Sequence, residues 1–249
     1  MLHTEREQQI LNLLKQAGGF VSVKTLCDTL FASESSVRRD LKALEDRGLV
    51  KRSYGGASPT VAHSHIVTFN HRARRNADAK RVIAQKAVTL IEDGDIVFLD
   101  QSSTAFYLAN ELVDRSSITV VTNNIEIMML LSDTRVRVIS SGGSLSDANR
   151  NCLVGGEAQK TFENIYADWL FFSAKALSDD GAVTDCDPEE IAVRHAMLKN
   201  ARKTVLLCDS TKFGERAVFK QCDLRDIDVL VCEGDADDRF HSYPTLKVL

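Results

Sequence analysis

The sequence predicts a two-domain chain, in which a small winged helix-turn-helix precedes a larger α/β domain with a mostly parallel sheet. Before residue 57, three segments with helical apolar spacing are followed by a strand pattern and a glycine pair. From residue 79 onward, short apolar runs alternate with helical segments, which is typical of βα units. The stretch between them loses this periodicity. We therefore expect domains at 1–57 and 79–249, joined by a linker at 58–78.

Three helix starts are recognisable in the first domain. Thr4 and Glu7 form a capping-box pattern, and the helix that they open should end at Gly18-Gly19. Ser22 and Ser33 each precede a further helical pattern, and a serine hydroxyl at such a position accepts a backbone N–H of the first turn. The sequence therefore predicts a second and a third helix, separated by a tight connection.

A short strand pattern follows the third helix. Gly48 should end that helix, and Leu49–Tyr54 is expected to form a strand before Gly55-Gly56. We expect the extended pair Phe20-Val21 to lie beside Leu49-Val50, which would complete a strand pair. This order of elements predicts a winged helix-turn-helix.

The third helix carries the side chains expected to meet DNA. Val37, Leu41 and Leu44 recur at helical spacing and should face the core, which leaves hydroxyls and two adjacent arginines exposed. Such groups near a helix N-terminus suit the phosphates and base edges of a major groove, and two cations on the wing would reach phosphates. The candidate DNA-binding residues are Ser33, Ser35, Ser36, Arg38, Arg39, Lys51 and Arg52.

The bland interpretation is a solvated face of a protein-interaction module, with ordinary surface charges on the wing. The distribution of charge favours DNA. The chain has a formal net charge of −4, yet the first 81 residues hold more Lys and Arg than Asp and Glu, while the remainder is acidic. This asymmetry is expected when one end of a chain meets a polyanion such as double-stranded operator DNA.

Composition disfavours several other classes. No stretch approaches the roughly 18 consecutive apolar residues of a membrane span, and the N-terminus has no secretory apolar region. The six cysteines are scattered without a C-x-x-C pair, which fits a reducing cytosol and predicts a cytoplasmic protein. His63, His65 and His71 are not at metal-ligand spacing. We therefore expect no metal, no cofactor and no membrane partner.

Strands and helices alternate in the second domain. Continuous apolar runs indicate strands that are buried on both faces, as in a helix-covered parallel sheet. Helical patterns occupy 79–91, 104–112, 124–131, a shorter segment near Lys160, and 189–200. The candidate strands are Ile96–Leu99, Ile118–Val121, Val136–Ile139, Trp169–Phe172, Val205–Cys208 and Val229–Cys232.

Polar segments follow five of these strands, namely Asp100–Thr104, Thr122–Asn124, Ser140–Gly143, Ser173–Lys175 and Asp209–Gly214. Ligands of open α/β sheets bind beyond the carboxyl ends of the strands. Helix N-termini with serines can hold a phosphate there, amides and a carboxylate can address hydroxyls, and a lysine supplies positive charge. The alternative is that these residues only cap helices and make turns. Five such segments at one edge favour a site for a polyhydroxylated, anionic small molecule.

Across these motifs the chain resembles the DeoR-type bacterial transcription regulators over nearly its whole length. The similarity runs from Arg6 to Ala57, including Arg38–Leu41 and Tyr54–Ala57, and continues in the second domain through Gly142-Gly143, Val154-Gly155 and residues 209–214. The resemblance implies a winged helix-turn-helix repressor whose sensor domain is similar to ribose-5-phosphate isomerases and CoA transferases. It also implies a phosphorylated sugar effector, control of carbohydrate uptake or catabolism genes, and a homo-oligomer (dimer or tetramer) on repeated or palindromic operators.

The resemblance further implies a sugar-phosphate pocket made by Asp100, Ser102–Thr104, Asn123, Asn124, Gly142, Gly143 and Lys212. The family usually has Asp-x-Gly-Thr-Thr after the first strand, whereas this chain has Ser102 in place of the glycine, which adds a side chain where a ligand would approach the backbone. Lys175-Ala176 also replaces a segment that is often glycine-rich, so the ligand can differ from the common one. With neighbouring residues, the candidate effector site comprises Asp100, Ser102, Ser103, Thr104, Thr122, Asn123, Asn124, Gly142, Gly143, Lys175, Glu190 and Lys212.

The competing interpretation is an isomerase or transferase with an accessory N-terminal interaction module. Asp100, Glu190 and Lys212 are the carboxylates and amine that such chemistry would use. A fold does not by itself imply an activity, however, and a fused DNA-binding domain makes a sensor the simpler explanation. The sequence therefore favours a regulator over an enzyme.

Overall fold

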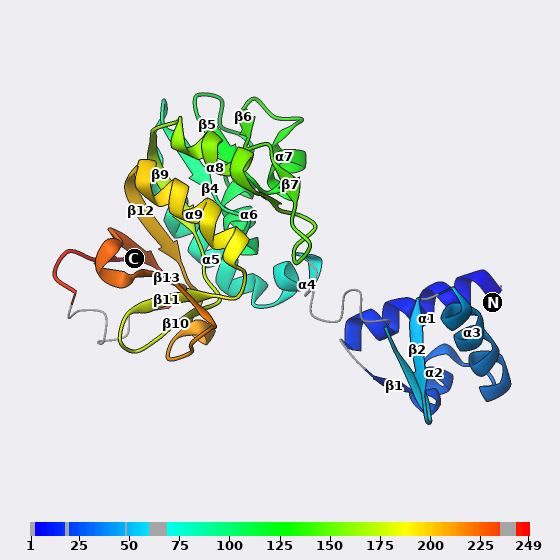
Figure 1. Ribbon diagram of the computed structural model, residues 1–249. Coiled ribbons are helices and arrows are strands. Elements are labelled where there is room, and N and C mark those ends of the chain that lie inside the picture. The colour runs from blue at the N-terminus through cyan, green and yellow to red at the C-terminus, as the bar shows by residue number, and fades with distance from the viewer. Residues whose placement is uncertain (1–2, 18–19, 48, 60–68, 235–242) are drawn as a thin grey trace. The chain divides into compact units, whose positions relative to one another are not determined.

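The computed structural model describes residues 3–17, 20–47, 49–59, 69–234 and 243–249. The chain forms two compact units, Met1–Val67 and Thr68–Leu249, and each is described by itself (Figure 1). Part of the linker predicted at 58–78 is helical, since α4 spans Phe69–Arg74 and α5 begins at Ala77. The predicted chain stops at Gly18-Gly19 and Gly48, and the linker histidines His63 and His65, lie outside the described residues.

The first unit contains three helices and a small sheet. Helices α1 (His3–Ala17), α2 (Val23–Leu30) and α3 (Glu34–Asp46) are joined with strands β1 (Val21–Ser22), β2 (Val50–Ser53) and β3 (Gly56–Pro59). Ser22 and Ser33 cap α2 and α3 as predicted, by accepting the N–H groups of Thr25 and Ser36. The buried apolar face predicted for α3 is confirmed at Val37, Leu41 and Leu44, which pack with Ile10, Leu14 and Leu26.

The predicted pairing of Phe20-Val21 beside Leu49-Val50 is wrong. The strand order is β1-β3-β2, so β3 lies between them and Val21 pairs with Ala57. β3 has the sequence Gly-Ala-Ser-Pro, with none of the β-branched residues that mark a strand. Gly55, at φ +82, turns the chain between β2 and β3, and a Cβ at Gly56 would lie 2.2 Å from the Val21 carbonyl oxygen. The wing is therefore a β2–β3 hairpin against which β1 pairs.

The second unit is built on a seven-stranded sheet of order β15-β14-β12-β9-β4-β5-β6 (Figure 1). Every pair is parallel, as predicted. The six predicted strands are confirmed, and β15 near the C-terminus is an addition. The strands are β4 (Ile96–Leu99), β5 (Thr119–Thr122), β6 (Arg137–Ser140), β9 (Ala167–Phe172), β12 (Ala201–Leu207), β14 (Val229–Val231) and β15 (Lys247–Val248).

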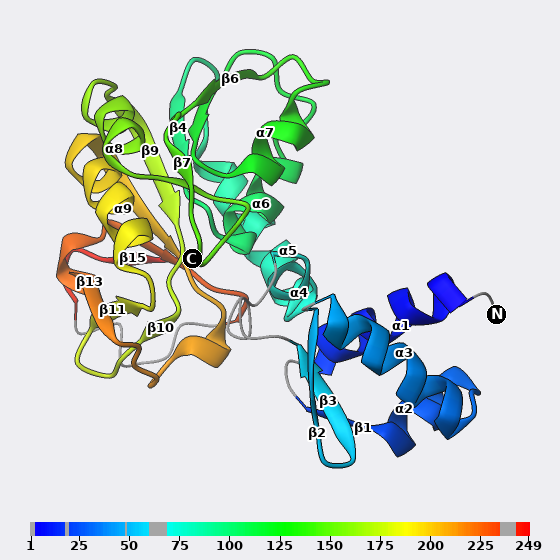
Figure 2. The same cartoon turned by 45° about the vertical axis from the view of Figure 1, so that its right-hand side comes forward.

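Helices cover both faces of this sheet (Figure 2). On one face α5 (Ala77–Ala87), α6 (Ser103–Asn110) and α7 (Ile125–Leu131) bury a core that includes Ile83 and Leu108. On the other, α8 (Gly156–Glu163) and α9 (Pro188–Asn200) enclose Phe162 and Met197. This three-layer arrangement explains the continuous apolar strands, because each strand contributes to both cores.

Short additional strands edge the unit. β10 (Ala176–Leu177), β11 (Ala182–Asp185) and β13 (Phe219–Asp223) form an antiparallel sheet, and β7 (Ser144–Leu145) pairs with β8 (Leu153–Val154). Among the described residues, no helix is both long and apolar enough to cross a membrane.

Candidate functional site

The exposed face of α3 presents the predicted hydroxyls and arginines. The Ser33 hydroxyl caps the helix and lies 2.9 Å from the Ser36 hydroxyl. Arg38 is engaged with Glu34 one turn earlier, at 2.5 Å, while the exposed Arg39 makes no hydrogen bond or ion pair within the described residues. Arg39 is therefore the α3 arginine whose guanidinium is free for a partner.

Two ion pairs that the sequence analysis missed hold α3 against α1. The buried carboxylate of Asp40 accepts Arg6 Nε at 2.5 Å, and Arg47 Nη2 lies 2.7 Å from Glu7 Oε2. Asp40 directly follows Arg39, so anchoring this carboxylate in the unit turns the Arg39 side of α3 outward. Spacing alone does not distinguish a buried aspartate from a surface one, which is why these pairs escaped detection.

On the wing, the two predicted cations differ in their contacts. Arg52 Nε lies 2.6 Å from Glu45 Oε2, and the Arg52 backbone N–H also donates to that carboxylate, which lowers the pKa of Glu45. Lys51 is exposed and makes no ion pair within the described part of the chain. Lys51 is therefore the wing cation more available to a phosphate.

The five predicted polar segments do follow the carboxyl ends of parallel strands. After β5 and β6 are added on one side of β4, the chain continues with β9 on the other side (Figure 1). The strand order therefore reverses between β4 and β9, and such a switch point is where α/β sheets bind ligands. Asp100 ends β4 and Ser173 ends β9, and the Ser173 backbone N–H donates to Asp100 Oδ2 at 3.2 Å.

Asp100 is fully buried in a charge cluster centred on Arg194 of α9. Arg194 Nε lies 3.2 Å from Asp100 Oδ2, Nη1 lies 3.0 Å from Asp185 Oδ2, and Nη2 lies 3.6 Å from Glu190 Oε2. Burial raises the pKa of Asp100, and Arg194 opposes that rise. Arg194 is itself buried, and the three carboxylates raise the pKa of its guanidinium although burial opposes its charge. The sequence analysis missed Arg194, since an arginine in a helical pattern is ordinarily a surface residue.

Glu190 joins this cluster to polar amides. Its Oε2 accepts Gln101 Nε2 at 2.7 Å and its Oε1 accepts Asn149 Nδ2 at 2.9 Å. Burial raises the pKa of Glu190, while Arg194 and then Arg72 act in the opposite direction. Gln101 and Asn149 were not predicted.

The β5 segment is also buried. The Thr122 hydroxyl donates to the Leu99 carbonyl at 2.7 Å and ties β5 to β4. Asn123 Nδ2 donates to the Leu153 carbonyl at 3.1 Å, and Asn124 Oδ1 caps α7 by accepting the N–H of Glu126 at 2.9 Å. Each asparagine thus commits one end of its amide to the protein.

Ser102 stands where the sequence comparison expects glycine, and its conformation requires none. Its φ is −73°, and its hydroxyl accepts the Ala105 N–H at 3.0 Å as the N-cap of α6. Gly142 and Gly143 are exposed at φ +65 and +100, and a Cβ on Gly143 would lie 2.4 Å from the Val154 carbonyl oxygen. Lys175 is exposed, and its backbone N–H donates to the Thr184 carbonyl at 3.1 Å.

Cations gather beside the start of α6, where the buried Ser103 and Thr104 lie. Lys212 Nζ donates to the Ser173 hydroxyl at 2.8 Å, and Lys80 Nζ donates to the Ser103 hydroxyl at 3.0 Å. Burial lowers the pKa of Lys80 to about 8, and repulsion from Lys212, Arg72 and Arg75 adds to this, while Asp209 opposes it. The predicted site contains Lys212 alone of these cations.

The turn before α5 is fixed to the same region. Asn76 adopts a left-handed conformation at φ +54, and its Nδ2 donates to Asp209 Oδ1 at 2.9 Å and to the Thr211 hydroxyl at 3.0 Å. Lys80 donates to the carbonyls of Arg72 and Arg75, which end α4. The α4–α5 corner is therefore part of the structure around the sheet edge.

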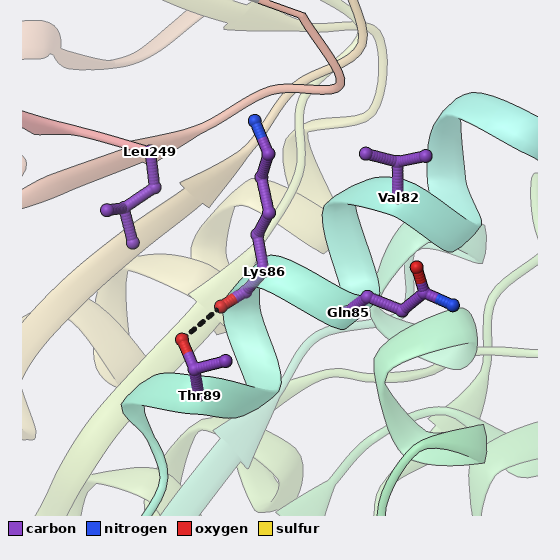
Figure 3. Close-up of a pocket in the computed structure, with 5 residues that line it drawn as sticks. All are labelled: Val82, Gln85, Lys86, Thr89 and Leu249. Carbon is purple, nitrogen blue, oxygen red and sulfur yellow. Dashed lines mark hydrogen bonds between the residues drawn. The ribbon is translucent and has the colours of Figure 1, made fainter.

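A surface pocket of about 360 Å³ lies on α5 and is lined by Val82, Gln85, Lys86, Thr89 and Leu249 (Figure 3). None of these is a predicted site residue. Its one charged group, Lys86 Nζ, already donates to the Cys232 carbonyl at 3.0 Å. The sheet edge, which brings several cations and buried amides together, is the better candidate for a polar ligand.

Comparisons with known proteins match both units. Residues 6–60 match the DeoR-like helix-turn-helix domain, and residues 75–234 match the DeoR C terminal sensor domain. The chain is 34% identical to the HTH-type transcriptional regulator GlpR of Haloferax volcanii, over 96% of this chain and 94% of that protein. It is 30% identical to the glycerol-3-phosphate regulon repressor of Haemophilus influenzae, over 98% and 94%. Among solved structures, it is similar to ribose 5-phosphate isomerase A of Methanocaldococcus jannaschii, with TM-score 0.43, 19% identity and 55% of each chain covered.

Proposed function

Because the chain belongs to the DeoR family of transcriptional regulators, we propose that it represses a carbohydrate uptake or catabolism operon and that a phosphorylated sugar relieves this repression. It is a DNA-binding regulator rather than an enzyme, since both domains and the full-length relatives are those of regulators. A relative named for a glycerol-3-phosphate regulon supports a phosphorylated effector. A regulator that binds DNA works in the bacterial cytoplasm.

The DNA-binding part of the proposal assigns α3 to the major groove. Arg39, free and exposed, would contact a base edge or phosphate, with Ser33, Ser35, Ser36 and Arg38 beside it. Lys51 and Arg52 of the wing would contact phosphates. Two copies on a repeated or palindromic operator would double this interface, which supports a homo-oligomer (a dimer or tetramer).

The observation that carries the effector proposal is the group of cations around the N-terminus of α6. Lys212 and Lys80 lie on Ser173 and Ser103, next to backbone N–H groups of a helix start, and this combination suits a phosphate. The residues proposed to surround the effector are Asp100, Ser102, Ser103, Thr104, Thr122, Asn123, Asn124, Gly142, Gly143, Lys175, Glu190 and Lys212. Asp100 and Thr122 would act by holding the strand ends in register, because their side chains are bonded to the protein.

Thermal unfolding of the full chain against sugar phosphates, the matching free sugars and acyl-CoAs tests this proposal. A ligand at about a hundred times its Kd should stabilise the sensor unit by roughly 2.7 kcal/mol. We expect stabilisation by at least one sugar phosphate and none by its free sugar. Stabilisation by acyl-CoA with turnover would instead support the enzyme interpretation.

Lys212→Ala provides the matching variant. It should bind operator DNA as the wild type does and lose its response to the sugar phosphate, because Lys212 lies in the sensor unit and away from α3 in the chain. A retained response would count against the assignment of the phosphate to this edge.

A further inference from the structure

Several buried polar atoms at the sheet edge have no hydrogen-bond partner within the described residues. They are Arg72 Nε and Nη2, Gln101 Oε1, Asn123 Oδ1 and Asn124 Nδ2. Gln101, Asn123 and Asn124 are at most 1% exposed. A buried group without a partner costs about 1–3 kcal/mol, so a concentration of them in one region indicates a place built for a ligand.

These atoms come from three segments that meet at the sheet edge. Asn123 and Asn124 follow β5, and Gln101 follows the adjacent strand β4. Gln101 is bonded to Glu190, and Arg72 is close enough to Glu190 to lower the pKa of that carboxyl. Arg72 also acts on the Cys152 thiol, whose sulfur lies 3.3 Å from Asn123 Nδ2. The Arg72 guanidinium therefore belongs to the same region as the amides.

The chemistry of the free atoms follows from the ends already in use. Asn123 and Gln101 donate through their amide nitrogens, which leaves two oxygen acceptors. Asn124 accepts through its oxygen, which leaves an N–H donor. Hydroxyl groups satisfy acceptors and donors alike. The two N–H groups of Arg72 on one side of its guanidinium form a fork that matches two oxygens of a phosphate or carboxylate.

Helix α4 is fixed in place around Arg72. Phe69 meets Phe106 of α6 edge to face with ring centroids 5.3 Å apart, and the Tyr107 hydroxyl donates to the Ala73 carbonyl at 3.1 Å. Lys80 binds the carbonyls at the end of α4 and the Ser103 hydroxyl at the start of α6. Figure 2 shows α4 beside the start of α5. A group bound between Arg72 and the α6 N-terminus would contact α4 directly.

We propose that Arg72 of α4 binds the anionic group of the effector, while Gln101, Asn123 and Asn124 bind its hydroxyls. The inference rests on the proposed function and adds two statements to it. The effector is a small polyol with one anionic group, and α4, the first described element after the residues that connect to the DNA-binding unit, is part of its binding site. Occupancy of the site is thereby sensed by the segment that leads to that unit.

The test compares Arg72→Met with Arg74→Met in the full chain. Arg74 is an exposed arginine on the same helix, so the two variants change the net charge and helix equally. Calorimetric titration with inorganic phosphate, and with the sugar phosphate that stabilises the wild type most, should show a Kd at least about tenfold higher in Arg72→Met, as for loss of one charge-assisted pair. Arg74→Met should stay within about twofold of the wild type. Arg72→Lys should lie between, because it keeps the charge and loses the fork.

Folding and hydroxyl recognition are controlled separately. Without ligand, Arg72→Met should melt no lower than the wild type, because it removes a buried cation that lacks hydrogen-bond partners. Gln101→Met should weaken binding of the sugar phosphate and leave inorganic phosphate unchanged. Wild-type phosphate affinity in Arg72→Met, or an equal loss in Arg74→Met, would overturn the inference while a sugar-phosphate response still supports the proposed function. Absence of any phosphorylated ligand for the wild type would overturn both.

Discussion

Replacing Arg194 by methionine should destabilise the sensor unit by about 3–5 kcal/mol at neutral pH, the usual result of removing one partner from a buried ion cluster. Arg194 is 1% exposed and lies 3.2 Å from Asp100, 3.0 Å from Asp185 and 3.6 Å from Glu190. Each of these contacts contributes about 5 kcal/mol of Coulomb attraction at an effective dielectric constant near 20, before the cost of desolvation is subtracted. Methionine fills part of the space and leaves the carboxylates without their counter-ion.

The loss should shrink as the pH falls. Burial already raises the pKa of Asp100 and Glu190, and Arg194 opposes that rise. Without Arg194 both pKa values move further up, so protonation at about pH 5 neutralises carboxyls that are charged at about pH 7.5. The free energy of unfolding of the variant should therefore approach that of the wild type on acidification.

Urea unfolding followed by fluorescence measures this directly, because Trp169 is the one tryptophan of the chain and lies on β9. The control is Arg216→Met. Arg216 pairs with Asp180 at 2.6 Å, but both side chains are more than half exposed, so its loss should cost less than about 1 kcal/mol. A cost as small for Arg194→Met, or one that is equal at both pH values, would refute the proposed role of the buried cluster.

Three further predictions concern DNA, the α6 cap and Lys80. Arg39→Ala should weaken operator binding by about 1–3 kcal/mol in a gel-shift titration, whereas Arg216→Ala should leave it unchanged; equal affinities would remove α3 from the interface. Ser102→Ala should lower the unfolding free energy by about 1 kcal/mol through loss of the N-cap, and no change in urea midpoint would contradict that capping role. Effector affinity should fall between about pH 7 and pH 9, because Lys80, with its pKa lowered to about 8, loses its charge there. Each pKa unit that a bound anion restores corresponds to about tenfold in Kd, and calorimetry across this range would show no trend if Lys80 stayed outside the site.

Much of the sensor fold could be predicted because its strands are apolar on both faces. The runs 96–99, 169–172 and 205–208 alternate with helices, and that pattern is found as β4, β9 and β12. Elements of two to four residues escaped prediction. β3 is Gly-Ala-Ser-Pro and pairs through its backbone, which leaves no side-chain pattern. That is why the strand order of the wing was wrong.

The candidate site divides in the same way. Residues such as Asn123 and Lys212 follow strand ends, so the topology of a parallel sheet is enough to bring them to one edge. Arg72, Lys80 and Arg194 come from helices, where a cation is ordinarily a surface residue. Their burial results from tertiary packing and has no signature in spacing. A charge balance at the predicted edge would have asked for counter-ions to Asp100 and Glu190, which is the one signal that pointed to Arg194.

The most direct test of the account measures DNA affinity with and without effector in one solution. DNA selected in vitro by the purified full chain would be labelled, and its fluorescence anisotropy titrated with the chain in the presence of sugar phosphates or the matching free sugars. We predict that at least one phosphorylated sugar changes the Kd for this DNA by roughly 5–150-fold, the range of ordinary allosteric coupling, while its free sugar does not. An unchanged Kd across all phosphorylated sugars would contradict the central claim that this regulator senses a sugar phosphate.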